Sequence, residues 1–299
     1  MIYGENSQSI RYIMGGLADQ VQWMKLIRND DKAYAKLIDY LVPKWGPENP
    51  LFPNDIEIEI LDEEGASLLG KAPGHYYTLA LPAPLSRGDT RFADAAWAVA
   101  ELLRRCLPEK RERGVLIAAL GNPDVTPDAL GPLCAGNLLV TRHLKQRGEA
   151  AFAGFCSTLL VRTGVLGTTG LESAAQVRAL CEAAKPDCVL AIDALAGSEL
   201  AGLCRSVQIC DTGIAPGSGV GNDREALNEE YLGMPVVAVG VPTVIDASAL
   251  GGEGELRDLF VTPRFIDSAV RSVARVLAYG INLALHEGIS VEEIDLLVG

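Results

Sequence analysis

The segment VLIAAL, residues 115–120, is the first of five short apolar runs that alternate with helical segments. The other four are STLLV (157–161), CVLAI (188–192), SVQIC (206–210) and VVAVGV (236–241). Runs of five or six apolar residues bounded by Gly, Asp or Pro are typical of strands buried on both faces. Such strands belong to parallel sheets with helices on each side. We therefore predict a three-layer α/β fold with a mostly parallel central sheet.

The segments between and after these runs have helical patterns. We predict helices at about 128–145, 171–184, 198–204 and 222–232, and a last amphipathic helix at 263–287. The chain contains no internal repeat and no low-complexity tract.

The first 55 residues follow a different pattern. Apolar residues recur at three- and four-residue steps over 10–27, which predicts an amphipathic helix. A second helix at about 31–41 ends before Pro43, and KWGPENPLFPND (44–55) is typical of an irregular linker. We therefore predict an N-terminal helical extension over 1–55, followed by an α/β domain over 56–299.

Three further elements are expected before the apolar runs begin. IEIEIL (56–61) alternates strictly and predicts a half-buried strand, and HYYTLAL (75–81) predicts a second strand. Residues 91–107 predict a helix that turns Ala, Leu and Trp97 toward the interior.

Composition restricts the class of function. The net charge of -13 repels nucleic acid and anionic membranes, so we expect neither as a direct partner. No apolar stretch reaches the length of a membrane span, and the start of the chain does not resemble a secretory signal. The seven cysteines include no CxxC pair, which argues against a disulfide framework or a cysteine zinc site and favours a reducing cytoplasm.

Two aspartates lie in the loops where an open parallel sheet binds its ligands, beyond the carboxyl ends of the strands. Asp128 follows Pro127 in GNPDVTPDALGP (121–132), near the positive end of an expected helix. Asp193 directly follows the run at 188–192, where a buried charge is costly unless it is paired. The alternatives are that Asp128 only caps the helix and that Asp193 only holds a neighbouring loop.

If the two carboxylates converge, they form an acid–base pair. Two close carboxylates do not both ionise easily, so one of them keeps its proton to higher pH. One site then holds a general acid and a general base.

Two other loops supply candidate substrate-binding residues, namely Gly167, Thr168, Thr169 and Asp211. The first three offer hydroxyls and backbone N–H groups suited to a substrate carbonyl. Asp211 begins DTGIAPGSGVGND (211–223), whose glycines do not follow their strand as a dinucleotide-binding turn requires. We interpret this loop as a shaped substrate-facing or interface loop. The chain has no HExxH motif and no GxSxG motif, so neither a histidine-rich metal site nor a serine triad is expected.

Five ordered blocks of the sequence resemble the germination protease family. They are NPDVTPDALGPLCAGNLLVTRHL (122–144), GVLGTTGLES (164–173), KPDCVLAIDALA (185–196), QICDTGIAPGSGVGN (208–222) and LGMPVVAVGVPTVIDA (232–247). The family consists of endopeptidases of spore-forming bacteria that degrade small acid-soluble spore proteins during germination. The resemblance implies a phosphorylase/hydrolase-like fold similar to hydrogenase-maturation proteases, a zymogen, a homotetramer and two catalytic aspartates, which correspond to Asp128 and Asp193.

Two features depart from the family pattern. The Arg-Thr-Asp-Leu-Ala start has no counterpart, so we expect residues 1–55 to form a helical layer or subunit contact rather than a self-cleaved propeptide. Pro123 and Asp124 stand where the family typically has an aromatic residue and an asparagine, and Asp124 adds an acidic group near the site.

The resulting expectation is an aspartic-type endopeptidase of the spore-core cytoplasm that needs no cofactor and no metal. Its expected partners are small acid-soluble spore proteins as substrates and further copies of itself. The alternatives are a processing peptidase that holds a metal with its aspartates, as the hydrogenase-maturation resemblance suggests, and a diverged paralogue that only binds.

Overall fold

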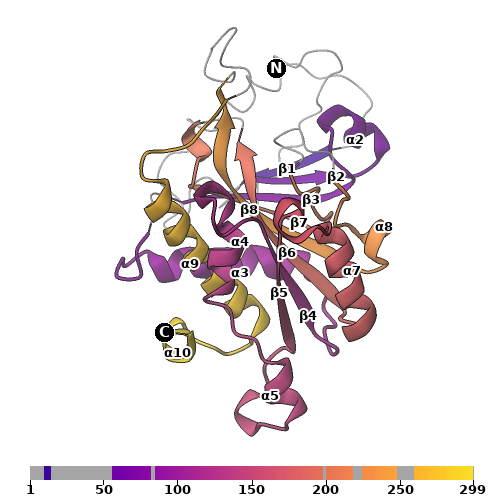
Figure 1. Ribbon diagram of the computed structural model, residues 1–299, viewed down its shortest axis with the longest axis vertical. Coiled ribbons are helices and arrows are strands. Elements are labelled where there is room, and N and C mark those ends of the chain that lie inside the picture. The colour runs from indigo at the N-terminus through magenta and orange to yellow at the C-terminus, as the bar shows by residue number, and fades with distance from the viewer. Residues whose placement is uncertain are drawn as a thin grey trace.

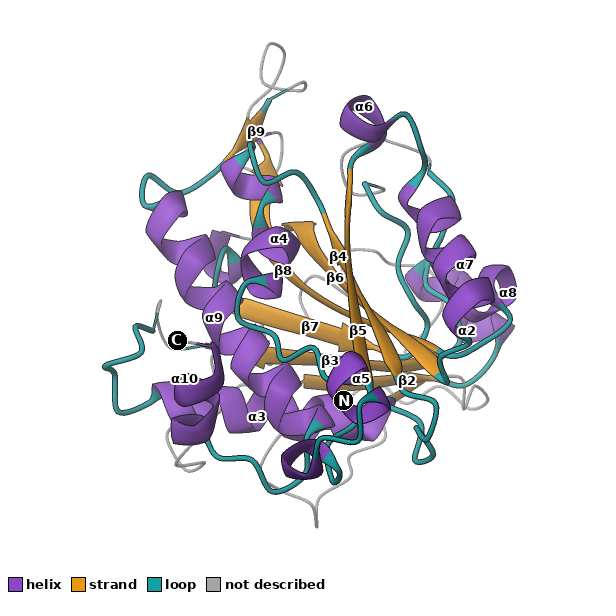
Figure 2. Ribbon diagram, turned by 60° about the horizontal axis from the view of Figure 1, so that its bottom comes forward, coloured by secondary structure: helices purple, strands orange, loops and turns teal. Residues whose placement is uncertain are grey.

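A nine-stranded sheet forms the centre of the protein (Figures 1 and 2). The computed structural model describes residues 10–14, 56–81, 85–197, 200–217, 224–247 and 259–298. The strands are β1 (Ile10–Met14), β2 (Ile56–Ile60), β3 (Gly74–Ala80), β4 (Val115–Leu120), β5 (Thr158–Gly164), β6 (Cys188–Gly197), β7 (Ser206–Cys210), β8 (Val236–Asp246) and β9 (Phe260–Val261). Their order is β1-β2-β3-β7-β8-β6-β4-β5, and β9 pairs with β8.

The centre of the sheet is parallel, as predicted. β4 lies between β5 and β6, with Val115 opposite Thr158 on one side and Cys188 on the other, and β6 pairs in parallel with β8. Every residue of β4 is buried, and so are the first six residues of β6. Strands covered on both faces need apolar side chains on both faces, which explains their uninterrupted apolar sequences.

One predicted strand runs in the opposite direction to the expected one. The segment 206–210 forms β7, which pairs antiparallel with β8 and with β3, and β3 continues antiparallel to β2. Few residues separate the end of β6 at Gly197 from the start of β7 at Ser206. A parallel return needs a crossover of about a dozen residues or more, so a connection this short reverses the strand.

The helix predicted over 10–27 is wrong at Ile10–Met14, which form β1. This strand pairs antiparallel with β2, from Ile10 opposite Ile60 to Met14 opposite Ile56. β2 would otherwise leave a row of unpaired N–H and C=O groups at the sheet edge, and such pairing overrides a local helical pattern. The rest of that predicted helix, the helix at 31–41 and the linker at 44–55 lie outside the described residues.

Helices cover both faces of the sheet (Figure 2). Their bounds are α2 (Glu63–Leu69), α3 (Phe92–Cys106), α4 (Leu130–Ala135), α5 (Arg142–Gln146), α6 (Leu166–Thr169), α7 (Ser173–Ala184), α8 (Glu229–Leu232), α9 (Ile266–Leu285) and α10 (Val291–Val298). α3, α4 and α9 lie against one face, and α7 and α8 lie on the other side. None of the helices within the described ranges is long and apolar enough to cross a bilayer.

The helix predicted at 128–145 is broken into a short 3-10 helix at Thr126–Asp128, α4 and α5. Between α4 and α5, backbone N–H groups donate to side chains distant in sequence instead of forming helical hydrogen bonds. Asn282 accepts from the N–H of Leu139 at 2.9 Å, and Thr158 accepts from the N–H of Thr141 at 3.0 Å. The helix predicted at 198–204 is only a turn at Leu200–Gly202, and neither α2 nor α10 was predicted.

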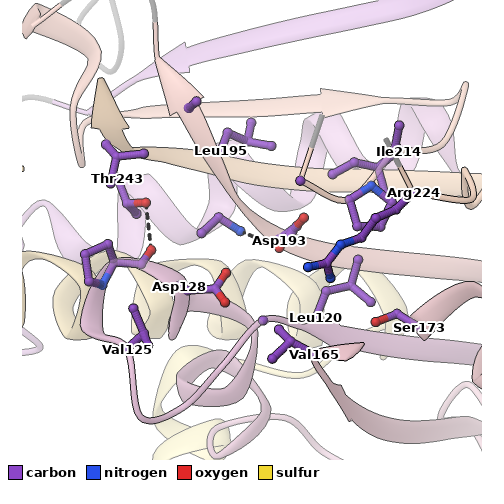
Figure 3. Close-up of a pocket in the computed structure, with 18 of the residues that line it drawn as sticks. Leu120, Val125, Asp128, Val165, Ser173, Asp193, Leu195, Ile214, Arg224 and Thr243 are labelled. Carbon is purple, nitrogen blue, oxygen red and sulfur yellow. Dashed lines mark hydrogen bonds between the residues drawn. The ribbon is translucent and has the colours of Figure 1, made fainter. Parts of the chain in front are cut away.

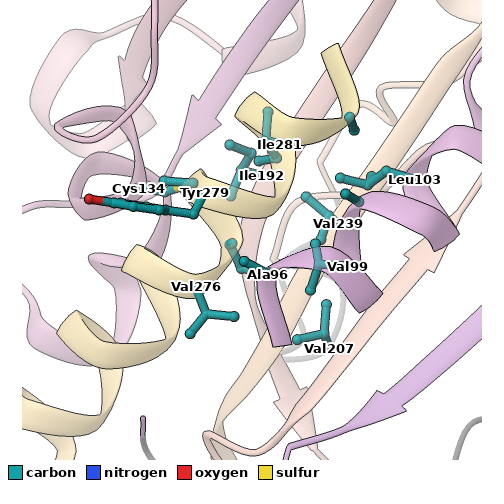
Figure 4. Packing of buried hydrophobic residues seen from close by; sticks show 14 of the residues in the cluster. Ala96, Val99, Leu103, Cys134, Ile192, Val207, Val239, Val276, Tyr279 and Ile281 are labelled. Atoms are coloured by element: carbon teal, nitrogen blue, oxygen red, sulfur yellow. The ribbon is translucent and has the colours of Figure 1, made fainter. Parts of the chain in front are cut away.

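The main core lies between the sheet and the α3–α9 pair (Figure 4). α3 contributes a buried stripe that includes Phe92, Val99 and Leu103. The prediction that Trp97 faces inward is wrong, because its side chain is 45% exposed and lies beside the Arg104 guanidinium, 5.5 Å from the ring centroid. Position 97 falls on the opposite side of the helix from that stripe.

His286, just after α9, makes the fold sensitive to acid. Its ring is buried, 5.0 Å from the ring of Phe155, and burial lowers its pKa from 6.5 to about 4. Between these two values the unfolded chain binds more protons than the folded one, so the free energy of unfolding falls as pH falls. We expect His286→Phe to flatten the loss of melting temperature between about pH 6.5 and about pH 4, the range between the two pKa values. The exposed His143, changed to Phe, is the control. If the melting temperature of His286→Phe falls with pH as steeply as that of the wild type, the burial of His286 is not the cause of the acid sensitivity.

Candidate active site

A cavity of about 500 Å³ opens at the carboxyl ends of the parallel strands. Residues that follow or end β4, β5, β6 and β8 line it, together with the loop that precedes α4 and the segments on either side of residues 218–223. The lining is largely apolar, and its ionisable side chains are Asp128, Asp193 and Arg224. The edge of the sheet predicted to bind a ligand thus contains a cavity with both predicted aspartates in its wall.

Asp128 is held by the loop that leaves β4. Gly121 turns the chain with a φ of +104°, and the N–H of Asn122 donates to Oδ2 of Asp128 at 2.8 Å. Thr243 of β8 fixes the preceding residue by donating to the carbonyl oxygen of Pro127 at 2.7 Å. α4 starts without a side-chain cap, so the carboxylate belongs to the loop and cavity rather than to helix capping.

The pKa of Asp128 is raised by burial. The hydrogen bond from Asn122 and the positive charge of Arg224 act in the opposite direction. These two interactions favour the ionised carboxylate.

Asp193 lies within β6 rather than at its end, because the strand continues to Gly197. It is 5% exposed, and the N–H of Ala194 donates to its Oδ1 at 2.9 Å. Burial and, after it, the negative charge of Asp128 raise its pKa to about 7, against smaller opposing contributions from Ala194 and Arg224. At neutral pH a substantial fraction of Asp193 therefore carries a proton.

The structure brings Asp128 and Asp193 together. Both line the same cavity, and Figure 3 shows their carboxyl groups directed toward the same part of it, with the Arg224 guanidinium beside them. The two carboxyls differ in environment, since Asp193 is more deeply buried and feels the charge of Asp128. Such a difference separates an acid from a base within one site.

The predicted substrate-binding loop residues lie elsewhere. Gly167, Thr168 and Thr169 form most of α6 and do not line the cavity, although the neighbouring Val165 does. The hydroxyls of Thr168 and Thr169 both donate to the carbonyl oxygen of Val165, at 3.0 and 3.2 Å. They close their own turn, which is a common use of such side chains at a helix start.

Asp211 also lies away from the cavity. It accepts a hydrogen bond from the backbone N–H of His75 at 2.8 Å and pairs with Nδ1 of the same residue at 2.7 Å. It therefore joins the start of β3 to the end of β7. The carboxylate is used in this tertiary contact rather than in the cavity.

Arg224 is a charged cavity residue that the sequence interpretation missed. It follows the glycine-rich loop, and residues 214–217 of that loop line the cavity as well. The signal that could have identified it is a single cation at the end of a loop that returns to the carboxyl edge of the sheet.

Comparison with known proteins identifies the family. The sequence model of the germination protease family matches residues 53–254, which include Asp128, Asp193 and Arg224. The chain belongs to the germination protease family. The resemblance seen in the five sequence blocks is thereby confirmed, and membership makes this protein a protease, hence a hydrolase that acts on protein.

Curated germination proteases match over most of the chain. That of Clostridium perfringens is 36% identical over 279 residues, covering 80% of this chain and 86% of the relative. That of Caldanaerobacter subterraneus subsp. tengcongensis is 36% identical over 282 residues, covering 81% and 87%. That of Bacillus cereus is 42% identical over 195 residues, covering 64% and 53%.

Among solved structures, the NiFe hydrogenase maturation protease HycI from Thermococcus kodakarensis KOD1 is similar, with a TM-score of 0.37 and 20% identity. The match covers 62% of this chain and 98% of HycI.

The burial of Asp193 gives this germination protease a stability that depends on pH. Its pKa is about 7 in the folded chain against an ordinary 3.8, so the folded protein binds more protons between these values. The free energy of unfolding then falls as pH rises through this window, by roughly 2–4 kcal/mol at most. We expect Asp193→Asn to match the wild type in melting temperature near the lower pKa and to exceed it above the upper one. A variant less stable than the wild type above pH 7 would show that the ionised carboxylate supports the fold and would contradict this expectation.

Proposed function

We propose that this germination protease is an endopeptidase that hydrolyses small acid-soluble spore proteins with Asp128 and Asp193 as its catalytic residues. The observation that carries this proposal is the pair of carboxyls in one cavity with unequal environments. Peptide hydrolysis needs one group that takes a proton from water and one that gives a proton to the leaving nitrogen.

The environments favour one assignment of these roles. Asp128 accepts a hydrogen bond from Asn122 and feels the charge of Arg224, which both favour its ionised form. It acts as the general base. Asp193, with a pKa of about 7, holds its proton and acts as the general acid.

The chemical steps balance with these two groups alone. Asp128 takes a proton from water while the water oxygen bonds to the carbonyl carbon of the substrate, and the carbonyl oxygen becomes an oxyanion. The oxyanion then reforms the carbonyl as the C–N bond breaks, and Asp193 gives its proton to the nitrogen. A proton passes from Asp128 to Asp193 to restore the starting state.

The direct test is incubation with a purified small acid-soluble spore protein, followed by mass spectrometry of the fragments. Internal cleavage at defined bonds supports an endopeptidase. An intact substrate that co-purifies with the protein would instead favour the diverged paralogue that only binds.

Chelation separates the plain two-aspartate reaction from its metal-dependent alternative. In the described part of the chain no three His, Cys, Asp or Glu side chains gather as a metal site, and the aspartate pair would supply two carboxylate ligands. We expect cleavage of the spore protein to be unchanged, within about twofold, after treatment with EDTA. If cleavage is lost with EDTA and recovered with added Mg²⁺, Mn²⁺ or Zn²⁺, the metal-dependent alternative is correct.

The assembly and location proposed for the protein follow from its family, whereas the proposal on processing rests on the departure of residues 1–55 from the family pattern. We propose a homotetramer in the spore-core cytoplasm, with the part of residues 1–55 outside β1 serving as an added layer or subunit contact rather than as a self-cleaved propeptide. Light scattering measures the assembly. Mass spectrometry of the stored protein detects self-trimming within residues 1–55, and trimming that raises activity would contradict the proposal.

A further inference from the structure

Arg224 reaches into the cavity, where no described residue is bonded to its guanidinium. Figure 3 shows its guanidinium beside Asp193 and Asp128, and it lines the same cavity. No hydrogen bond and no ion pair within 4 Å joins the Arg224 side chain to another residue of the described ranges. Other arginines are paired, such as Arg87 with Asp295 and Arg113 with Asp187. A half-buried guanidinium with free donors beside two carboxyls is therefore placed to bind something else in the cavity.

The charge of Arg224 acts on both aspartates although it is not salt-bridged to either. Its charge opposes the rise in pKa that burial causes in Asp128 and in Asp193. The guanidinium is thus close to the place where water and substrate must meet, yet its N–H groups remain available.

The two-aspartate reaction leaves one charge without a partner. When water attacks the carbonyl carbon, a full negative charge develops on the carbonyl oxygen, while Asp128 has taken the proton of water and Asp193 serves the nitrogen. A fixed cation or N–H donor aimed at such an oxygen is often the largest single contribution to catalysis. In a largely apolar cavity the interaction is stronger than it would be in water.

We propose that Arg224 is a catalytic residue that donates hydrogen bonds to the carbonyl oxygen of the scissile peptide bond and stabilises the oxyanion. This inference rests on the proposed endopeptidase function, and it names a residue that stabilises the charge which the two aspartates leave on the carbonyl oxygen. The planar fork of N–H donors suits an oxygen that holds two lone pairs.

The competing role for Arg224 is that it only shifts the pKa values of the two aspartates. The two roles differ in their effect on the pH dependence of kcat. Without Arg224 the pKa of each aspartate rises, so the pH optimum moves upward in either case. If Arg224 only tunes the aspartates, kcat at the new optimum equals that of the wild type. If it binds the oxyanion, kcat stays low at every pH.

The experiment compares Arg224→Gln, Arg224→Lys and Arg224→Ala, with the exposed Arg205→Gln as the matched control. Cleavage of a small acid-soluble spore protein is measured across the pH range, and circular dichroism verifies folding. We expect kcat at each variant's own optimum to fall about 10²–10³-fold in Arg224→Gln, with a smaller change in KM. Arg224→Lys should recover part of the loss, since it restores charge without the fork.

Chemical rescue of Arg224→Ala by free guanidinium separates the two roles. If Arg224 only shifted the pKa values of the aspartates, guanidinium would not raise kcat at the pH optimum of the variant. Guanidinium ion, added far below denaturing concentrations, should raise the kcat of Arg224→Ala and leave Arg205→Gln unchanged. A kcat within about threefold of wild type at the shifted optimum, or a folded Arg224→Ala that guanidinium does not activate, would overturn the proposal. Absence of cleavage by the wild type would instead reject the proposed function itself.

Discussion

Asp128→Asn and Asp193→Asn are each expected to lower kcat by about 10³-fold or more, near the upper range for loss of a general acid or base. Asn keeps the size of the side chain, and its Oδ1 can still accept the N–H of Asn122 or Ala194. It cannot exchange a proton at neutral pH, so the reaction loses one of its two proton-transfer groups. Cleavage of the spore protein, followed by mass spectrometry, measures the loss.

Asp124→Asn is the matched control for this prediction. Asp124 is an exposed carboxylate in the same loop as Asp128 and does not line the cavity. We expect it to cleave like the wild type. If the aspartates of the cavity were purely structural, Asp128→Asn and Asp193→Asn would be destabilised and would cleave in proportion to the folded fraction. Melting curves recorded with the activities separate the two cases.

Gly121→Ala is expected to lower kcat about 10²-fold, because it displaces Asp128 from its position. A β-carbon at residue 121 would lie 2.1 Å from the carbonyl oxygen of Asp128 and 3.1 Å from its Oδ1. The φ of +104° adds strain for any residue with a side chain, on the order of 1–3 kcal/mol. The loop must therefore move, and the carboxylate moves with it.

Gly148→Ala is the control for the strain alone. Gly148 has a φ of +73° with nothing within 4 Å of an added β-carbon, so its substitution strains the backbone without moving another group. We expect Gly148→Ala to lower the melting temperature and to keep the wild-type kcat. Equal kcat values for the two variants would mean that the position of Asp128 does not limit the reaction.

The centre of the sheet could be predicted because a strand buried on both faces is apolar at every position, and this pattern is visible within a short segment. VLIAAL and CVLAI consist of apolar residues without alternation, and β4 and the first part of β6, which they form, are buried at every position. The direction of β7 could not be predicted in the same way. SVQIC carries no signal of its orientation, which is set by the short connection from β6 and by pairing with β8.

Helix boundaries and inward faces were decided by partners distant in sequence. The helical pattern at 128–145 gives way because Asn282 and Thr158 bond the backbone of Leu139 and Thr141. A residue-by-residue propensity contains no information about these partners. Trp97 was expected inside because it is large and apolar, yet the inward stripe of α3 falls on other positions.

The sequence by itself determined the α/β class, the parallel centre and the placement of Asp128 and Asp193 at one edge of the sheet. Each of these follows from patterns within short segments, because burial and strand direction fix which loops share an edge. Tertiary structure alone decided that Arg224 joins the two aspartates, that Thr168 and Thr169 close their own turn, and that Asp211 pairs with His75. The reason is that a polar side chain binds the nearest suitable group in space, and chain topology rather than local sequence sets which group that is.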